Sequence, residues 1–182
     1  MLKGRFMCSR ILLAFDESDS SRAALGEAAR IARFAGGVVH VVNVVDKAPA
    51  YPFAVHNDLS LMNTALHRRG RALLDTAAKE LARLGVAYDT ATVDASSMSQ
   101  DIASCLHRHA QFIRADIVVM GSHGRRGLAH AALGSVAERF VREAPCAVMV
   151  VKEASVPDEL EPSCSNFWRV GELNRCRNPG RK

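Results

Sequence analysis

A pattern of glycine and serine in the last third of the chain carries the strongest chemical signal in the sequence. It reads Gly-Ser-His-Gly at residues 121–124 and, after nine further residues, Gly-Ser at 134–135. The apolar run 117–120 precedes it, and a segment with the spacing of an amphipathic helix follows it. A strand, a glycine loop and a helix start place backbone N–H groups and the positive end of a helix dipole at one sheet edge. The pattern therefore predicts a phosphate-binding loop.

Several polar residues around this loop have more than one interpretation. Asp16 follows an apolar run and could contact a ligand or cap the next helix. Ser135 and Glu138 form a Ser-x-x-Glu capping box, which would explain both residues without a ligand. His123 could serve as a general base, but no orienting carboxylate or nucleophile stands near it in sequence, so a loop histidine that contacts backbone is favoured. We predict no catalytic residue and no metal site.

The alternation of apolar runs and helical spacing predicts a sheet that would bring these groups together. Strands are expected at 10–15, 38–45, 86–92, 117–120 and 147–151, and helices at 24–35, 66–84, 102–113 and 136–144. Residues 46–63, with two prolines, are expected to form a long loop. The alternation predicts an α/β fold: a doubly wound, five-stranded, mostly parallel sheet with helices on both faces and strand order 3-2-1-4-5. The alternation of apolar runs and helical spacing ends near residue 152. We therefore expect a domain at 1–152 and a mobile tail at 153–182.

The order of the strands places the expected site. In a doubly wound sheet, ligands bind beyond the carboxyl ends of the strands, where the strand order reverses. Here that point lies between the first and fourth strands, so we expect Asp16 and the loop 121–124 to face each other across one crevice. No GxGxxG motif follows the first strand and no GxxxxGK[ST] motif occurs in the chain. Both a dinucleotide-dependent dehydrogenase and a P-loop NTPase are therefore disfavoured.

Composition narrows the class of protein further. A chain of 182 residues with 48% hydrophobic content can bury the core of one domain. Its 24 basic and 19 acidic residues are dispersed, so no nucleic-acid partner is expected. The apolar runs are far shorter than the roughly 20 residues that a membrane span needs, and no apolar signal segment opens the chain. The five cysteines contain no CxxC pattern, which fits reduced thiols in the cytoplasm.

Three segments resemble the universal stress protein family. They are Asp-Ile-Val-Val-Met-Gly-Ser-His-Gly-Arg-Arg-Gly-Leu at 116–128, Leu-Gly-Ser-Val-Ala-Glu at 133–138 and Pro-Cys-Ala-Val at 145–148. Asp16 after the first strand and Val-Val-Asn-Val-Val-Asp at 41–46 match as well. The ATP-binding branch of the family carries the motif G-x2-G-x9-G-[ST], which this chain fits without a gap. The resemblance covers most of the predicted domain and none of the tail.

This resemblance implies a nucleotide site and assigns roles within it. Asp16 and the backbone of Val44 would flank the adenine and ribose, and Gly121 and Gly124 would approach the ribose and the α-phosphate. Residues 134–136 would hold the β- and γ-phosphates through backbone N–H groups and the serine hydroxyl. The full expected nucleotide-binding set is Ala14, Asp16, Val44, Met120, Gly121, Ser122, His123, Gly124, Gly134, Ser135 and Val136.

The function that the resemblance implies is that of a cytoplasmic, ATP-binding stress-response module with at most slow hydrolysis. Any Mg²⁺ would arrive with the triphosphate. Two alternatives stay open: an ATP-hydrolysing or nucleotidyl-transfer enzyme that uses the same crevice, and a dimeric interaction module that binds no nucleotide. The fifth strand, Ala147–Val151, is an apolar edge that needs cover. The resemblance implies that a second copy of the chain provides it, so we expect a homodimer.

Overall fold

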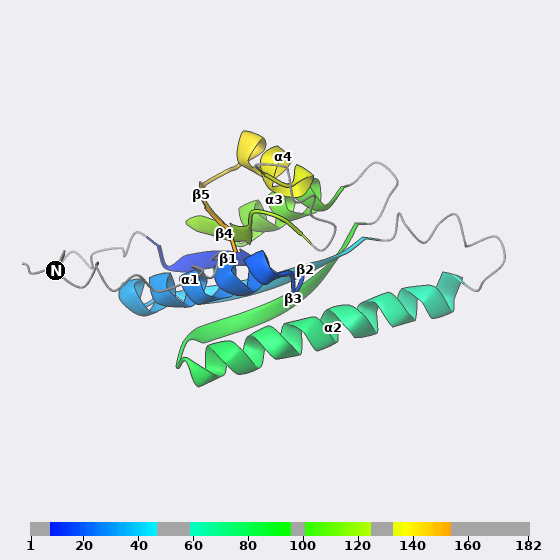
Figure 1. Cartoon of the computed structure of the whole chain (residues 1–182), viewed down its shortest axis with the longest axis horizontal. Coiled ribbons are helices and arrows are strands. Elements are labelled where there is room, and N and C mark those ends of the chain that lie inside the picture. The colour runs from blue at the N-terminus through cyan, green and yellow to red at the C-terminus, as the bar shows by residue number, and fades with distance from the viewer. Residues whose placement is uncertain (1–7, 47–58, 96–100, 125–132, 154–182) are drawn as a thin grey trace, which may run out of the picture.

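The computed structural model describes residues 8–46, 59–95, 101–124 and 133–153 (Figure 1). Strands and helices alternate along these residues in the order β1 (Arg10–Ala14), α1 (Asp19–Ala35), β2 (Val38–Asp46), α2 (Leu59–Arg83), β3 (Ala87–Ala95), α3 (Ile102–Phe112), β4 (Ile117–Gly121), α4 (Ser135–Glu143) and β5 (Ala147–Val151). Residues 154–182, nearly all of the predicted tail, lie outside the described part of the chain.

The strands form one sheet in the order β3-β2-β1-β4-β5, and every pairing is parallel. β1 is central: Leu13 pairs with Val41 of β2 on one side and with Val119 of β4 on the other. The predicted α/β fold and its strand order are confirmed. Because every strand is parallel, all of their carboxyl ends lie at the same edge of the sheet.

Helices cover both faces of the sheet, as Figure 1 shows. A hydrophobic cluster lies on each face of the sheet, and alternate residues of β1 belong to different clusters. Ile11 and Leu13 pack under α1 and α2, whereas Leu12 packs under α3 and α4. Five of the eight buried residues of α1 are alanine, which lets that helix lie close to the strands. A sheet buried on both faces explains why its strands read as continuous apolar runs rather than as alternating ones.

Helix α2 begins earlier than expected. It starts at Leu59, so the predicted long loop at 46–63 is wrong for its last residues; residues 47–58 lie outside the described part of the chain. Figure 1 shows that the amino-terminal end of α2 extends beyond the sheet. Leu61 is accordingly 69% exposed. Among the described residues, neither hydrophobic cluster includes a side chain from these first turns, which agrees with the missing helical period in the sequence there. No helix in the described ranges has the length and apolarity to cross a membrane.

Candidate functional site

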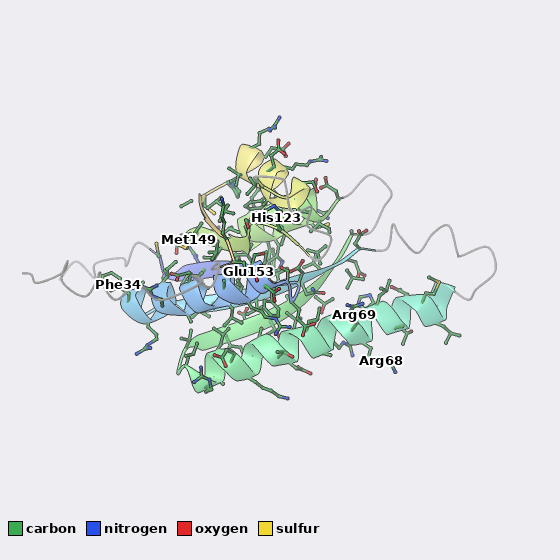
Figure 2. All side chains as sticks on the ribbon, viewed as in Figure 1. Phe34, Arg68, Arg69, His123, Met149 and Glu153 are labelled. Carbon is green, nitrogen blue, oxygen red and sulfur yellow. The ribbon has the colours of Figure 1, made fainter. Side chains whose placement is uncertain are left out.

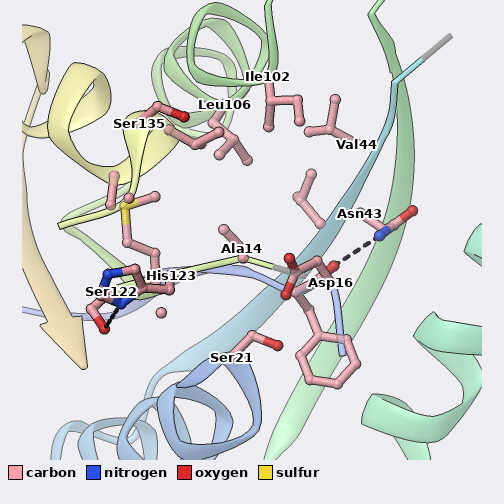
Figure 3. Close-up of a pocket in the computed structure, with 18 of the residues that line it drawn as sticks. Ala14, Asp16, Ser21, Asn43, Val44, Ile102, Leu106, Ser122, His123 and Ser135 are labelled. Atoms are coloured by element: carbon pink, nitrogen blue, oxygen red, sulfur yellow. Dashed lines mark hydrogen bonds between the residues drawn. The ribbon is translucent and has the colours of Figure 1, made fainter. Parts of the chain in front are cut away.

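A cavity of about 320 Å³ opens at the carboxyl edge of the sheet, beyond the ends of the neighbouring strands β1 and β4 (Figure 3). It lies at the predicted switch point, between the turn after β1 and the glycine loop after β4. Each of the sequence-predicted site residues lines it: Ala14, Asp16, Val44, Met120, Gly121, Ser122, His123, Gly124, Gly134, Ser135 and Val136. The turn after β1 and the glycine loop after β4, more than 100 residues apart in the chain, thus line the same cavity.

The sequence did not reveal the rest of the lining, which is Phe15, Ser21, Val42, Asn43, Asp46, Ile102, Leu106, Leu133 and Ala137. Ile102 and Leu106 come from α3, and Figure 3 shows them facing Val44 across the top of the cavity. Their i, i+4 spacing marks a buried helix face, and nothing in that pattern distinguishes a cavity wall from ordinary core. The result is an apolar side to the cavity.

The turn after β1 holds Asp16 over the cavity. Its Oδ1 accepts hydrogen bonds from the backbone N–H of Ser18 at 3.0 Å and from the Ser18 hydroxyl at 2.6 Å. Ser18, not Asp16, is the N-cap of α1, and its Oγ accepts from the N–H of Ser21. The interpretation of Asp16 as the cap is therefore wrong, because Asp16 orients the residue that caps.

Each glycine of the motif permits a close approach within the chain itself. A Cβ on Gly124 would lie 2.8 Å from Oδ2 of Asp16, so the two sides of the crevice meet there. A Cβ on Gly121 would lie 2.8 Å from the backbone nitrogen of Ser21. At Gly134 it would lie 3.1 Å from the carbonyl oxygen of Ser122. Packing therefore requires small residues at these positions whether or not a ligand is bound.

The start of α4 presents backbone N–H donors to the cavity. Gly134 is the N-cap and provides no side-chain hydrogen bond, so the expected capping box of Ser135 and Glu138 is not formed. The N–H of Gly134 donates to the carbonyl of Ser122 at 2.7 Å, so this group is already engaged. The next N–H groups, from Ser135 onward, have no intrahelical acceptor because they belong to the first turn. With the helix dipole, they make this end of α4 suited to an anion.

His123 lies at the centre of the glycine loop. Its Nδ1 is 3.0 Å from the hydroxyl of Ser122, and Figure 3 shows the ring beside Ser122, across the cavity from Asp16. Its backbone carbonyl accepts from the hydroxyl of Ser20 at 2.5 Å and lies 3.1 Å from the Ser18 oxygen. This arrangement fits the favoured interpretation of a histidine that belongs to the loop structure.

Two further contacts fix the walls. Asn43 is buried, and its Nδ2 donates to the carbonyl of Phe15 at 2.8 Å, the dashed line at the right of Figure 3, which satisfies the last carbonyl before Asp16. Asp101 caps α3 and forms an ion pair with Arg139 of α4. Burial raises the pKa of Asp101, but the hydrogen bonds from Ser104 and the charge of Arg139 together hold it below its usual value. Asp101 is therefore ionised at neutral pH and links the two helices that line the cavity.

Comparisons with known proteins agree with this architecture. The model of the universal stress protein family matches residues 7–152. A universal stress protein of Methanocaldococcus jannaschii is 30% identical over 150 residues, which cover 82% of this chain and 85% of that protein. A crystal structure from the same family in Burkholderia pseudomallei is 33% identical, with a TM-score of 0.63, over 80% of this chain and 96% of that one.

A more distant structure shares the fold. The universal stress protein from Archaeoglobus fulgidus, solved in complex with dAMP, is 20% identical with a TM-score of 0.57, over 80% of this chain and 99% of that one. The match of the family model to most of the chain and the two relatives above 25% identity determine the assignment: this chain belongs to the universal stress protein family.

Proposed function

We propose that this protein binds an adenine nucleotide, ATP with Mg²⁺ being the expected form, and acts as a nucleotide-dependent regulatory module in the cytoplasm with at most slow hydrolysis. The observation that carries the proposal is the open amino terminus of α4, which faces Asp16 across a cavity lined by the whole glycine motif. The dAMP complex of the Archaeoglobus fulgidus relative supports a nucleotide as the ligand.

The cavity has one side suited to a base and another suited to phosphate. Val44, Ile102 and Leu106 form an apolar side, against which a flat heterocycle would bury its faces. Asp16 lies between that side and the glycine loop, where its carboxylate would accept hydrogen bonds from ribose hydroxyls. The first turn of α4 then supplies N–H donors for the phosphates.

Charge in the cavity favours a nucleotide that brings a cation. Asp16 and Asp46 both line it, and none of the lining residues in the described part of the chain is lysine or arginine. A triphosphate alone would add negative charge beside two carboxylates. Mg²⁺, which prefers phosphate and carboxylate oxygens, would offset that charge. We therefore expect binding of ATP to weaken when EDTA is added.

The test is to identify the nucleotide that co-purifies with the protein and to titrate the stripped protein with ATP by calorimetry. The variant Gly124→Val should lose binding, because its side chain would displace the Asp16 carboxylate that approaches Gly124. Gly26→Ala is the matched control, since a Cβ there meets nothing within 4 Å. A wild-type protein that carries no nucleotide and does not bind added ATP would contradict the proposal.

A further inference from the structure

The hydroxyl of Ser20, in the first turn of α1, holds the backbone of His123 in the glycine loop. The Ser20 hydroxyl donates to the His123 carbonyl at 2.5 Å, and the His123 N–H points back to the Ser20 oxygen at 3.4 Å. Ser20 is only 5% exposed, so water does not compete effectively for these bonds. Residues 103 positions apart in the chain are joined at this point.

The Ser18 hydroxyl also lies near the His123 carbonyl, at 3.1 Å, but it has a better acceptor. It is 2.6 Å from Oδ1 of Asp16, an ionised group, and charge-assisted hydrogen bonds are shorter and stronger than neutral ones. A serine hydroxyl has a single proton to donate. Ser18 therefore gives its proton to Asp16, and of the two serines it is Ser20 that donates to the His123 carbonyl.

Gly121 provides a second, independent sign that the Ser20 contact is built into the site. A Cβ on Gly121 would overlap the Ser20 oxygen and lie 2.9 Å from the Ser20 carbonyl carbon. Glycine at 121 thus makes room for Ser20. Ser20 itself is not part of the cavity lining, so its contacts act on the loop and not on a ligand.

We infer that Ser20 is a positioning residue for the phosphate side of the nucleotide site. It fixes the loop 121–124 against the first turn of α1, which keeps Gly124 next to Asp16 and the loop in register with the start of α4 before a ligand arrives. Holding the loop in its binding conformation lowers the entropy lost on binding. The inference rests on the proposed function, because it assigns Ser20 a role in that same site.

The test compares Ser20→Ala with Ser9→Ala. The Ser9 hydroxyl donates to Asp116 at the opposite edge of the sheet, so this control also loses one serine hydrogen bond. Calorimetric titration with Mg-ATP and with adenosine separates the two sides of the site. We expect Ser20→Ala to weaken ATP binding by roughly tenfold, as for one buried hydrogen bond, with adenosine binding unchanged. Ser9→Ala should leave both affinities unchanged.

Two results would overturn the inference while the proposed function stands: ATP affinity unchanged in Ser20→Ala, or equal losses for ATP and adenosine, which a general loosening of the fold produces. If the wild type binds neither ligand, the proposed function fails. Amide hydrogen exchange in residues 121–124 then decides the structural claim alone. Faster exchange in Ser20→Ala than in Ser9→Ala supports the positioning role, and equal rates contradict it.

Discussion

At the scale of single residues, Asp116 joins the starts of β1 and β4, at the edge of the sheet opposite the cavity. Its Oδ2 accepts from the backbone N–H groups of Ser9 at 3.0 Å and Arg10 at 2.9 Å, and the Arg10 guanidinium lies 3.5 Å from Oδ1. Burial raises the pKa of Asp116, but these hydrogen bonds and the arginine charge outweigh burial and lower it below its ordinary value. The ionised form therefore stabilises the fold.

We predict that Asp116→Asn destabilises the protein at neutral pH, by about 1 kcal/mol from the loss of charge-assisted bonds. Because the folded pKa is depressed, this contribution is fully present above the unfolded pKa of about 4 and is lost as pH falls through the folded pKa. Urea denaturation at pH 7 and near pH 3 should show the difference between variant and wild type closing in acid. A difference that is the same at both pH values would contradict this. Nucleotide affinity should not change.

The residues that we propose for the phosphate side could be singled out from sequence, because glycine and serine recur there at a fixed spacing after an apolar strand. Of the three residues on the apolar side, only Val44 was among the expected site residues. Leu106 of α3 and Val42 of β2 have the same spacing as any core residue, and only the packing of α3 on the sheet makes them line a cavity. Packing within the fold also requires glycine at these positions, as where Asp16 approaches Gly124. No sequence pattern could predict that contact.

At the scale of elements, α1 has one glycine inside it and one at its C-cap, and the two positions have opposite requirements. Gly36 ends the helix at φ 62°, in the left-handed region, and its N–H donates to the carbonyl of Ala32. Gly26 lies inside the helix, where a Cβ would meet nothing within 4 Å. The first position needs glycine for its backbone conformation and the second does not.

Alanine at these two positions should therefore change stability in opposite directions. Gly36→Ala should cost about 1 kcal/mol, because alanine is strained at positive φ, whereas Gly26→Ala should stabilise by about 0.5–1 kcal/mol through helix propensity. Thermal or urea denaturation of each variant and of the wild type measures both changes in the free energy of unfolding. A destabilised Gly26→Ala would show that α1 packs more tightly at Gly26 than the structure indicates.

The ends of elements were harder to predict than their existence. The start of α4 is one residue away from the capping box that the sequence suggested, because Gly134 donates to the carbonyl of Ser122 and so fixes where the helix begins. The start of α2 was missed because apolar side chains in its first turns, such as Leu61, are exposed and follow no helical period. In both cases a long-range contact, or the lack of one, overrode the local pattern.

At the scale of the whole molecule, the strand order could be predicted because chirality and short connections leave few ways to arrange five parallel strands. The two edges of the sheet are less constrained. β5 is one of them, and its backbone geometry shows which groups face outward. Val151 accepts from the N–H of Ser122, so its polar groups point toward β4. In a parallel strand the direction alternates, so the N–H and C=O groups of Val148 and Val150 point away from the sheet.

These outward groups are where a second copy of the chain would pair in the proposed homodimer, since an apolar edge strand of this kind needs cover. We predict a dimer by light scattering at micromolar concentration and a monomer for Val150→Pro, which removes one outward N–H and no bond to β4. Val150→Ala keeps that N–H and should remain a dimer. Circular dichroism should show both variants folded, because the remaining sheet is unaffected. A monomeric wild type, or a dimeric Val150→Pro, would show that β5 does not pair across a two-fold axis.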